Sequence, residues 1–228
     1  MHLEWLSLES KYLEESEKFY RNVLDLDVVD KTPNTKSFQA GNTVLRLVKP
    51  SVVPRGGVHT HYAFSAPRSE YGDWIDRIEE TLEFTPFEHE FGSSSSMYFY
   101  DPDRHCVEIG GRDDSGEGIT GIFEVVIEVE NLENSMEFYS ALGGSVIDDP
   151  GDEDRVRLSF GGFDLEIWEP RLGIADGQGG LHVDFGVSPD EEDVDMKYLS
   201  EHSNRQQYLE DGVKFRDSDG HYITVSDH

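Results

Sequence analysis

The chain has 228 residues, with 19 Lys and Arg against 48 Asp and Glu, which gives a formal net charge of −29 at pH 7 with His neutral. Most of such a surface repels a polyanion, so the composition excludes nucleic-acid binding through phosphates and disfavours anionic membranes. The charge is typical of a halophile, as in haloarchaea, because multimolar salt screens self-repulsion to within about 3 Å. An acidic protein from a low-salt organism is the alternative.

The length is sufficient for two small domains or one large domain. Cys106 is the single cysteine, so neither a disulfide framework nor a cysteine-based zinc site is available. The start of the sequence lacks the basic and apolar regions of a secretory signal, and no apolar run is long enough for a membrane span. We therefore expect a cytoplasmic protein.

The first half of the chain predicts two units, each made of a strand, a helix and further strands. Apolar residues alternate in the opening strands and then recur at helical spacing. The second unit closes around an Asp-Pro-Asp turn. The expected elements are strands over Leu3–Glu9, Thr43–Val48, Val58–Ser65, Met97–Tyr100 and Cys106–Ile109, a helix with Leu13, Phe19, Tyr20, Val23 and Leu24, and a helix with Tyr71, Trp74, Ile75, Ile78 and Leu82.

The second half predicts two more units on the same plan. The third unit starts at Phe123 and has its helix over Leu132–Leu142. The fourth starts at Leu181, has a weaker helix near Asp193–His202 and closes with strands over Lys214–Val225.

Four landmarks recur in the same order at nearly constant offsets of 116 to 121 residues, which indicates an internal duplication. The matched segments are Leu13–Tyr20 with Leu132–Tyr139, Leu45–Leu47 with Leu165–Ile167, Gly56–Phe64 with Gly179–Phe185, and Phe99–Asp103 with Phe215–Asp219. We predict a first domain over 1–110 with modules 1–57 and 58–110, a linker over 111–121, and a second domain over 122–228 with modules 122–178 and 179–228. Since no such unit can bury its sheet face alone, the units should pair edge to edge.

The repeated landmarks, with the His61–Phe64 and His182–Phe185 strand openings and the Tyr98–Asp103 segment, resemble the vicinal oxygen chelate superfamily. That superfamily contains glyoxalase I, extradiol ring-cleaving dioxygenases, and fosfomycin and bleomycin resistance proteins. The resemblance covers essentially the whole chain and implies an α+β fold of four βαβββ modules, which pair into curved sheets with the helices outside. It does not select a reaction, because the superfamily includes lyases, dioxygenases, transferases and binding proteins.

In that superfamily two paired modules hold one divalent metal in a cleft, and each module offers a position on its first strand and one on its last strand. The corresponding residues here, in module order, are Trp5 and Arg46, His61 and Glu108, Glu124 and Glu166, and His182 and Thr224. Apolar residues flank each carboxylate on its strand, and this alternation favours a cleft-facing orientation.

The order of module pairing decides which ligand set exists, and the sequence leaves it open. If modules pair in chain order, Trp5 and Arg46 occupy two ligand positions of the first cleft, which makes it unsuitable for a metal. The second cleft then lacks the two histidines and one carboxylate that ring cleavage uses. Pairing of the two inner modules instead assembles His61, Glu108, Glu124 and Glu166, a complete set of the glyoxalase I kind.

The leading hypothesis is therefore a glyoxalase I-like enzyme for a small substrate with neighbouring oxygens. Its cofactor would be one divalent ion, either Ni, Co, Zn, Mn or Fe, held by His61, Glu108, Glu124 and Glu166. The metal would polarise a substrate oxygen, and Glu124 or Glu166 would move a proton between adjacent carbons. We expect a small-molecule substrate as the partner, no nucleic acid or membrane, and a monomer or a homodimer.

Two other functions stay open. One is an extradiol ring-cleaving dioxygenase, which the four-module length favours. The other is a non-catalytic binder of small, antibiotic-like molecules, with Trp5, Tyr62, Tyr98, Tyr100 and Trp168 lining an aromatic pocket and Arg46 holding a carboxylate. Structural explanations compete at single positions: His61 as a hydrogen-bonded core histidine, Glu124 as a solvated surface acid, and Cys106 as a packed thiol.

Overall fold

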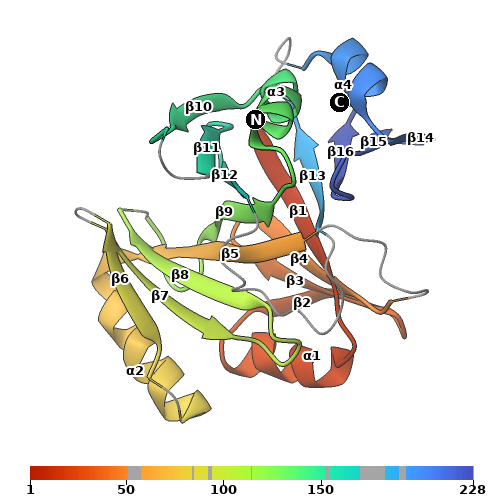
Figure 1. Cartoon of the computed structure of the whole chain (residues 1–228). Coiled ribbons are helices and arrows are strands. Elements are labelled where there is room, and N and C mark those ends of the chain that lie inside the picture. The colour runs from red at the N-terminus through yellow and green to blue at the C-terminus, as the bar shows by residue number, and fades with distance from the viewer. Residues whose placement is uncertain are drawn as a thin grey trace.

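The computed structural model describes residues 1–50, 58–83, 85–91, 94–113, 115–151, 155–169, 183–189 and 194–227. The first two modules fill the first half of the chain (Figure 1). Module 1 contains β1 (His2–Glu9), α1 (Leu13–Asn22), β2 (Asp27–Lys31), β3 (Thr35–Ala40) and β4 (Thr43–Val48). Module 2 contains β5 (Val58–Pro67), the short 3-10 helix η1 (Arg68–Glu70), α2 (Tyr71–Leu82), β6 (Phe87–Phe91), β7 (Ser94–Tyr100) and β8 (Cys106–Arg112).

The second half repeats this plan. Module 3 contains β9 (Gly121–Glu128), α3 (Leu132–Ala141), β10 (Ser145–Asp148), β11 (Arg155–Ser159) and β12 (Asp164–Trp168). Module 4 contains β13 (Val183–Ser188), α4 (Met196–His202), β14 (Arg205–Leu209), β15 (Gly212–Arg216) and β16 (Tyr222–Ser226). The expected strand-helix-strands units are confirmed. The α4 helix begins three residues later than the expected Asp193, after Asp195, whose side chain accepts a hydrogen bond from the Tyr198 backbone N–H.

The modules pair as inner with inner and outer with outer. The inner sheet joins modules 3 and 2 in the order β10-β11-β12-β9-β5-β8-β7-β6, and the outer sheet joins modules 4 and 1 in the order β14-β15-β16-β13-β1-β4-β3-β2. The antiparallel pairs β5 with β9 and β1 with β13 make the two junctions. Of the two arrangements that the sequence leaves open, the structure therefore has the one that unites His61, Glu108, Glu124 and Glu166 on one sheet.

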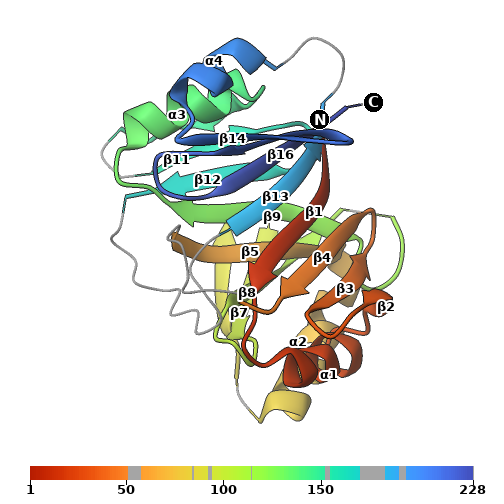
Figure 2. The same cartoon turned by 90° about the vertical axis from the view of Figure 1, so that its right-hand side faces the viewer.

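The helices lie at the two ends of the molecule, with α3 and α4 at one end, α1 and α2 at the other, and the sheets between them (Figure 2). Strand residues that face the helices are fully buried and apolar, as at Val107, Ile109, Leu165 and Ile167. The opposite side of each sheet carries the alternate, mostly polar residues, and we call it the polar face of that sheet. These observations confirm the α+β, glyoxalase-like fold class.

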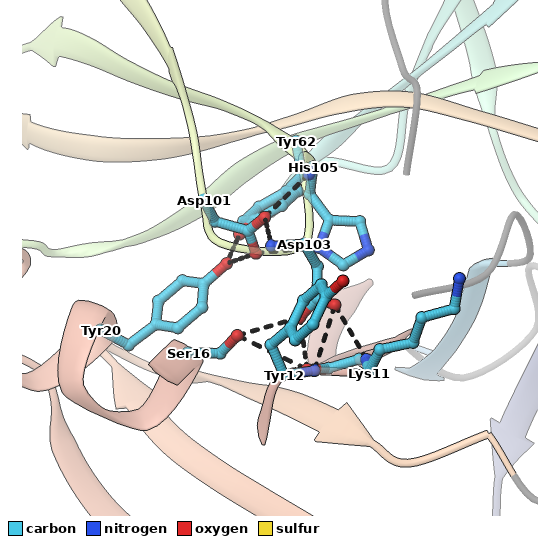
Figure 3. A network of polar contacts seen from close by, with 9 residues as sticks. Lys11, Tyr12, Ser16, Tyr20, Tyr62, Asp101, Asp103 and His105 are labelled. Atoms are coloured by element: carbon cyan, nitrogen blue, oxygen red, sulfur yellow. Dashed lines mark hydrogen bonds and ion pairs between the residues drawn. The ribbon is translucent and has the colours of Figure 1, made fainter. Parts of the chain in front are cut away.

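The turn between β7 and β8 joins module 2 to module 1 (Figure 3). The carboxylate of Asp103 accepts hydrogen bonds from the backbone N–H groups of Lys11 and Tyr12, at 2.8 and 3.3 Å, and from the Ser16 hydroxyl at 2.9 Å. Since α1 has no capping side chain of its own, Asp103 supplies the acceptor that the start of this helix requires. An acidic turn from one module thus fixes a helix of the other.

Module 4 contacts module 3 in the same way. Asp219, in the turn between β15 and β16, accepts a hydrogen bond of 2.7 Å from the Glu130 backbone N–H just before α3. The Asp-Pro-Asp turn predicted from the sequence is present, and this turn and the matching one in module 4 each join neighbouring modules. β8 ends at Arg112 and β9 begins at Gly121, so both strands enter the predicted linker range of 111–121.

Among the described residues, no helix combines the length and the apolar character that crossing a membrane requires.

Candidate metal centre

The four predicted ligand residues lie on four adjacent strands of the inner sheet. His61 is on β5, Glu108 on β8, Glu124 on β9 and Glu166 on β12, and their exposed fractions are 8%, 2%, 5% and 9%. Ala63 of β5 pairs with both Glu124 and Glu108, so that the two carboxylates flank this strand on one face. The side-chain alternation expected from the sequence therefore directs the predicted residues to the polar face.

Three of the four residues form a compact group. His61 Nε2 lies 3.2 Å from Glu108 Oε2 and 4.0 Å from Glu124 Oε2. One ligand atom from each of these three side chains lies within 4.8 Å of the other two. Ligand atoms at about 2.0–2.2 Å from a transition-metal ion lie about 3 to 4 Å from one another, so the spacing fits a single ion.

Two arginines on the neighbouring strand β11 hold the other carboxylate oxygens, and neither was among the residues predicted from the sequence. Arg157 Nη2 forms a very close ion pair with Glu124 Oε1, while Arg157 Nε contacts Asp164 at 3.1 Å. Arg155 Nη1 contacts Glu166 Oε1 at 2.8 Å. Glu166 thus lies beside the three-residue group with one oxygen in an ion pair. Alternation within Arg155–Ser159 places both arginines on the polar face, and this pattern was the signal available in the sequence.

Hydrogen bonding outweighs burial in setting the protonation of His61 and Glu108. Burial alone would lower the pKa of His61, but the contact with Glu108 and the charges of Glu108, Glu124 and Glu166 raise it. Burial would likewise raise the pKa of Glu108, but His61 and the hydroxyls of Ser96 and Tyr98 lower it. Both pKa shifts therefore favour a charge-assisted contact between His61 and Glu108.

The pKa of Glu124 is shifted upwards, in contrast to that of Glu108. Burial and the negative charges of Glu108 and Glu166 raise the pKa of Glu124 to about 8, although Arg157 and His61 act to lower it. A carboxyl group that titrates near neutral pH can both give and take a proton under ordinary conditions. The nearby Cys106 is buried, and burial raises the pKa of its thiol to about 12, so it is a packed thiol rather than a nucleophile.

The chemistry of this group fits a divalent cation. Glu108 and Glu124 are buried carboxyl groups whose Oε2 atoms face His61, and burying carboxylates is costly unless positive charge compensates them. One imidazole and two carboxylates are typical ligands of Zn, Ni, Co, Mn or Fe(II).

A second group of acids and a histidine has a structural explanation. Asp101, Asp103 and His105 are buried and close enough together to hold an ion. However, Asp101 accepts hydrogen bonds from two backbone N–H groups, from His105 Nδ1 at 2.9 Å and from the Tyr20 hydroxyl at 2.8 Å. With the Asp103 carboxylate also taken up at the start of α1, this group serves to join modules.

The predicted aromatic pocket is not formed. Tyr62 is fully buried in the core, where its hydroxyl lies 2.5 Å from that of Tyr20. Trp5 lies on the outer sheet and Trp168 on the inner sheet, so they cannot line one site on a single sheet face. This prediction was wrong because β5 alternates: His61 faces the polar side and Tyr62 therefore faces the core.

The model of the glyoxalase/bleomycin resistance protein/dioxygenase superfamily matches residues 2–109. The matched segment is similar to this superfamily, and solved structures share the fold of the whole chain. Among solved structures, a candidate dioxygenase from Bacillus subtilis covers 100% of the chain and is covered over 85% of its own length, with a TM-score of 0.76 and 18% identity. The match with glyoxalase I from Zea mays covers 99% of this chain and 92% of that protein, with a TM-score of 0.68 and 18% identity.

One curated relative has a name that describes a reaction. The metallothiol transferase FosB of Staphylococcus epidermidis is 28% identical over 135 residues, which are 56% of this chain and 87% of that protein. The family model and the curated relative agree with the resemblance expected from the sequence landmarks, while the relatives differ in the reactions that their names describe.

Proposed function

We propose that the protein is a metal-dependent enzyme of the glyoxalase I kind, which acts on a small substrate with two neighbouring oxygen atoms. The observation that carries this proposal is the convergence of His61, Glu108 and Glu124 on the polar face of the inner sheet. These three residues would hold one divalent ion, and Glu166 would complete the set from β12. When bound, such an ion supplies Lewis-acid polarisation of a substrate oxygen.

Glu124 is the residue that would move the proton. Its pKa of about 8 keeps a mixture of acid and carboxylate near neutral pH, as transfer between two adjacent carbons requires. Arg157 holds Glu124 Oε1 and thereby leaves Oε2 directed towards His61. Glu166 is the second candidate base, and Arg155 orients it in the same manner.

Metal content tests the first part of the proposal. The protein is stripped with a chelator, reloaded with Ni, Co, Zn, Mn or Fe(II) in turn, and analysed for bound metal. We expect one ion per chain in the wild type, and loss of it in His61→Asn and in Glu108→Gln. His202→Asn is the matched control, because His202 is exposed on α4, where it contacts the Tyr198 carbonyl and ring and none of the proposed ligands. A wild-type protein without stoichiometric metal would rule out the proposal.

Activity assays then distinguish the glyoxalase reaction from the other candidate reactions. Isomerisation of thiol adducts of 2-oxoaldehydes by the metal-loaded protein supports the glyoxalase reaction. Glu124→Gln should abolish this activity, and the metal bound to the variant is measured in the same sample.

A thiol-transfer reaction is the second candidate, because the FosB proteins are named metallothiol transferases. Consumption of a small thiol together with an electrophilic substrate, without isomerisation of oxoaldehyde adducts, would favour it. Ring cleavage uses two histidines and a carboxylate. The three-residue group contains one histidine, so it does not support this reaction. Oxygen uptake with catechols and Fe(II) tests that reaction directly.

A further inference from the structure

The outer sheet repeats the strand register of the inner sheet at its own junction. On the inner sheet Glu124 pairs with Ala63, Ala63 pairs with Glu108, and Glu166 pairs with Val126, two residues after Glu124. On the outer sheet Trp5 pairs with Gly186, Gly186 pairs with Thr224, and Arg46 pairs with Ser7, two residues after Trp5. The counterparts of the three inner carboxylates are therefore Trp5, Thr224 and Arg46.

The fourth counterpart differs from the one that the sequence analysis chose. His61 pairs with Cys106, and the equivalent pair on the outer sheet is Asp184 with Tyr222. Asp184 thus occupies the position of His61, whereas His182 lies outside the described residues. The outer junction has one guanidinium and one carboxylate where the inner junction has three carboxylates and an imidazole. The two outer charges offset each other, so the outer junction lacks the excess negative charge of the inner site.

Arg46 is the most informative residue of this outer junction. Its guanidinium is half-buried, and within the described part of the chain it has no ion pair or side-chain hydrogen bond; it lies 4.5 Å above the Trp5 ring. Burial lowers the pKa of Arg46, against the opposing charges of Asp184, Glu4 and Asp30. An arginine that stays unpaired in a chain with 48 acidic residues leaves five N–H donors available to a ligand.

Neighbouring groups extend this donor set. Lys214 Nζ lies 5.5 Å from the same Trp5 ring and 2.5 Å from Asp184 Oδ2. Thr224 Oγ1 is buried and has no hydrogen-bond partner among the described residues. The Trp5 indole lies directly over Gly186, where a Cβ atom would come within 2.2 Å of its Nε1. The indole is therefore fixed beside two cations and an unused hydroxyl.

We infer that the polar face of the outer sheet binds a small organic carboxylate at Arg46, Lys214 and Trp5. A planar guanidinium matches a carboxylate with two parallel hydrogen bonds, and the indole edge offers apolar contact to a ring or chain attached to it. The inner carboxylates favour a cation, whereas Arg46 and Lys214 together outnumber Asp184 and favour an anion. One repeated strand arrangement would thus serve two ligands in one chain. This site needs no metal and is independent of the proposed enzymatic function.

Calorimetric titration of the full-length protein with sodium benzoate tests the inference, with sodium acetate, potassium phosphate and neutral benzamide as comparison probes. We expect benzoate to bind once per chain and to shift the Trp5 indole N–H signal in the NMR spectrum, while benzamide does not bind. Arg46→Gln should weaken benzoate binding by at least about 10-fold, because hydrogen bonds to charged groups are the strong ones. Arg46→Lys should retain part of the affinity, since it keeps the charge and loses the planar fork.

Two matched variants locate the binding. Arg21→Gln removes an exposed arginine of α1 and should leave benzoate affinity unchanged. Glu108→Gln should lose the metal and keep benzoate binding, which separates this site from the inner one. The inference is overturned if no carboxylate binds at about 10 mM, if only phosphate binds, if Arg46→Gln binds benzoate as the wild type does, or if the shifted indole signal belongs to Trp168.

Discussion

The Tyr20 hydroxyl donates a hydrogen bond of 2.8 Å to Asp101 Oδ2, and through it a helix of module 1 contacts the acidic turn of module 2 (Figure 3). The duplicated pair, Tyr139 and Asp217, repeats this bond at 2.7 Å between modules 3 and 4. The sheets join modules 2 with 3 and 1 with 4, whereas these turns join 1 with 2 and 3 with 4. Each module is thus bonded to two others, and the four form a closed ring.

Tyr139→Phe tests the stabilising role of these turns. The substitution removes one hydrogen bond to a buried carboxylate, which still accepts backbone N–H groups from residues 219 to 221. We expect the free energy of unfolding to fall by about 1.5–3 kcal/mol, as measured from urea denaturation. Tyr208→Phe is the control, because Tyr208 is 78% exposed, and it should change the midpoint very little. Equal midpoints for both variants would contradict the role given to the turn.

Periodicity in the sequence was sufficient to predict the modules, because apolar alternation and helical spacing are local properties. It also placed Glu108 and Glu166 correctly on the polar face, between core residues such as Val107 and Ile167. Their assignment as metal ligands stays a prediction.

Module pairing could not be predicted, because any module can present the edge of its first strand to any other. The roles of Arg155 and Arg157 were missed for a related reason. Each guanidinium reaches a carboxylate of another strand, and such a contact depends on sheet order and side-chain conformation rather than on spacing along the chain. The match of His61 with Asp184 rather than His182 likewise became clear only from the paired register.

Gly186→Ala tests the packing of the outer junction. The added methyl group would come within 2.2 Å of Trp5 Nε1, so the indole must move from its position between Arg46 and Lys214. Overpacking of this kind costs about 1–3 kcal/mol of unfolding free energy. A double-mutant cycle with Trp5→Ala provides the check, since Gly186→Ala should be nearly neutral once the indole is absent. The same cost in both backgrounds would show that Trp5 does not lie over Gly186.

Glu124 should make the metal-free protein less stable as the pH rises. Its folded-state pKa of about 8 exceeds the ordinary value of 4.5, so the folded state holds a proton that the unfolded state has lost. This contribution to stability is complete below about pH 4.5 and is lost as the pH rises to about 8. The raised pKa of His61 acts in the same direction.

Urea denaturation of the chelator-treated protein at pH 6 and at pH 8.5 measures this effect. We expect a lower free energy of unfolding at pH 8.5, with a smaller difference in Glu124→Gln, which cannot lose the proton. Glu133→Gln, on the exposed side of α3, should retain the wild-type pH dependence. A pH dependence in Glu124→Gln as steep as in the wild type would assign the effect to other groups.

Salt should stabilise the fold through screening of its net charge of −29. Repulsion among exposed carboxylates opposes the compact state, and the Debye length falls from about 30 Å at 0.01 M to about 3 Å at 1 M salt. The melting temperature should therefore rise steeply over this range and less steeply above it. Potassium chloride and sodium chloride should act alike, because screening depends on ionic strength and not on the identity of the cation. A melting temperature that stays constant from 0.01 to 1 M, or that rises with only one of the two cations, would mean that the acidic surface does not limit stability by repulsion.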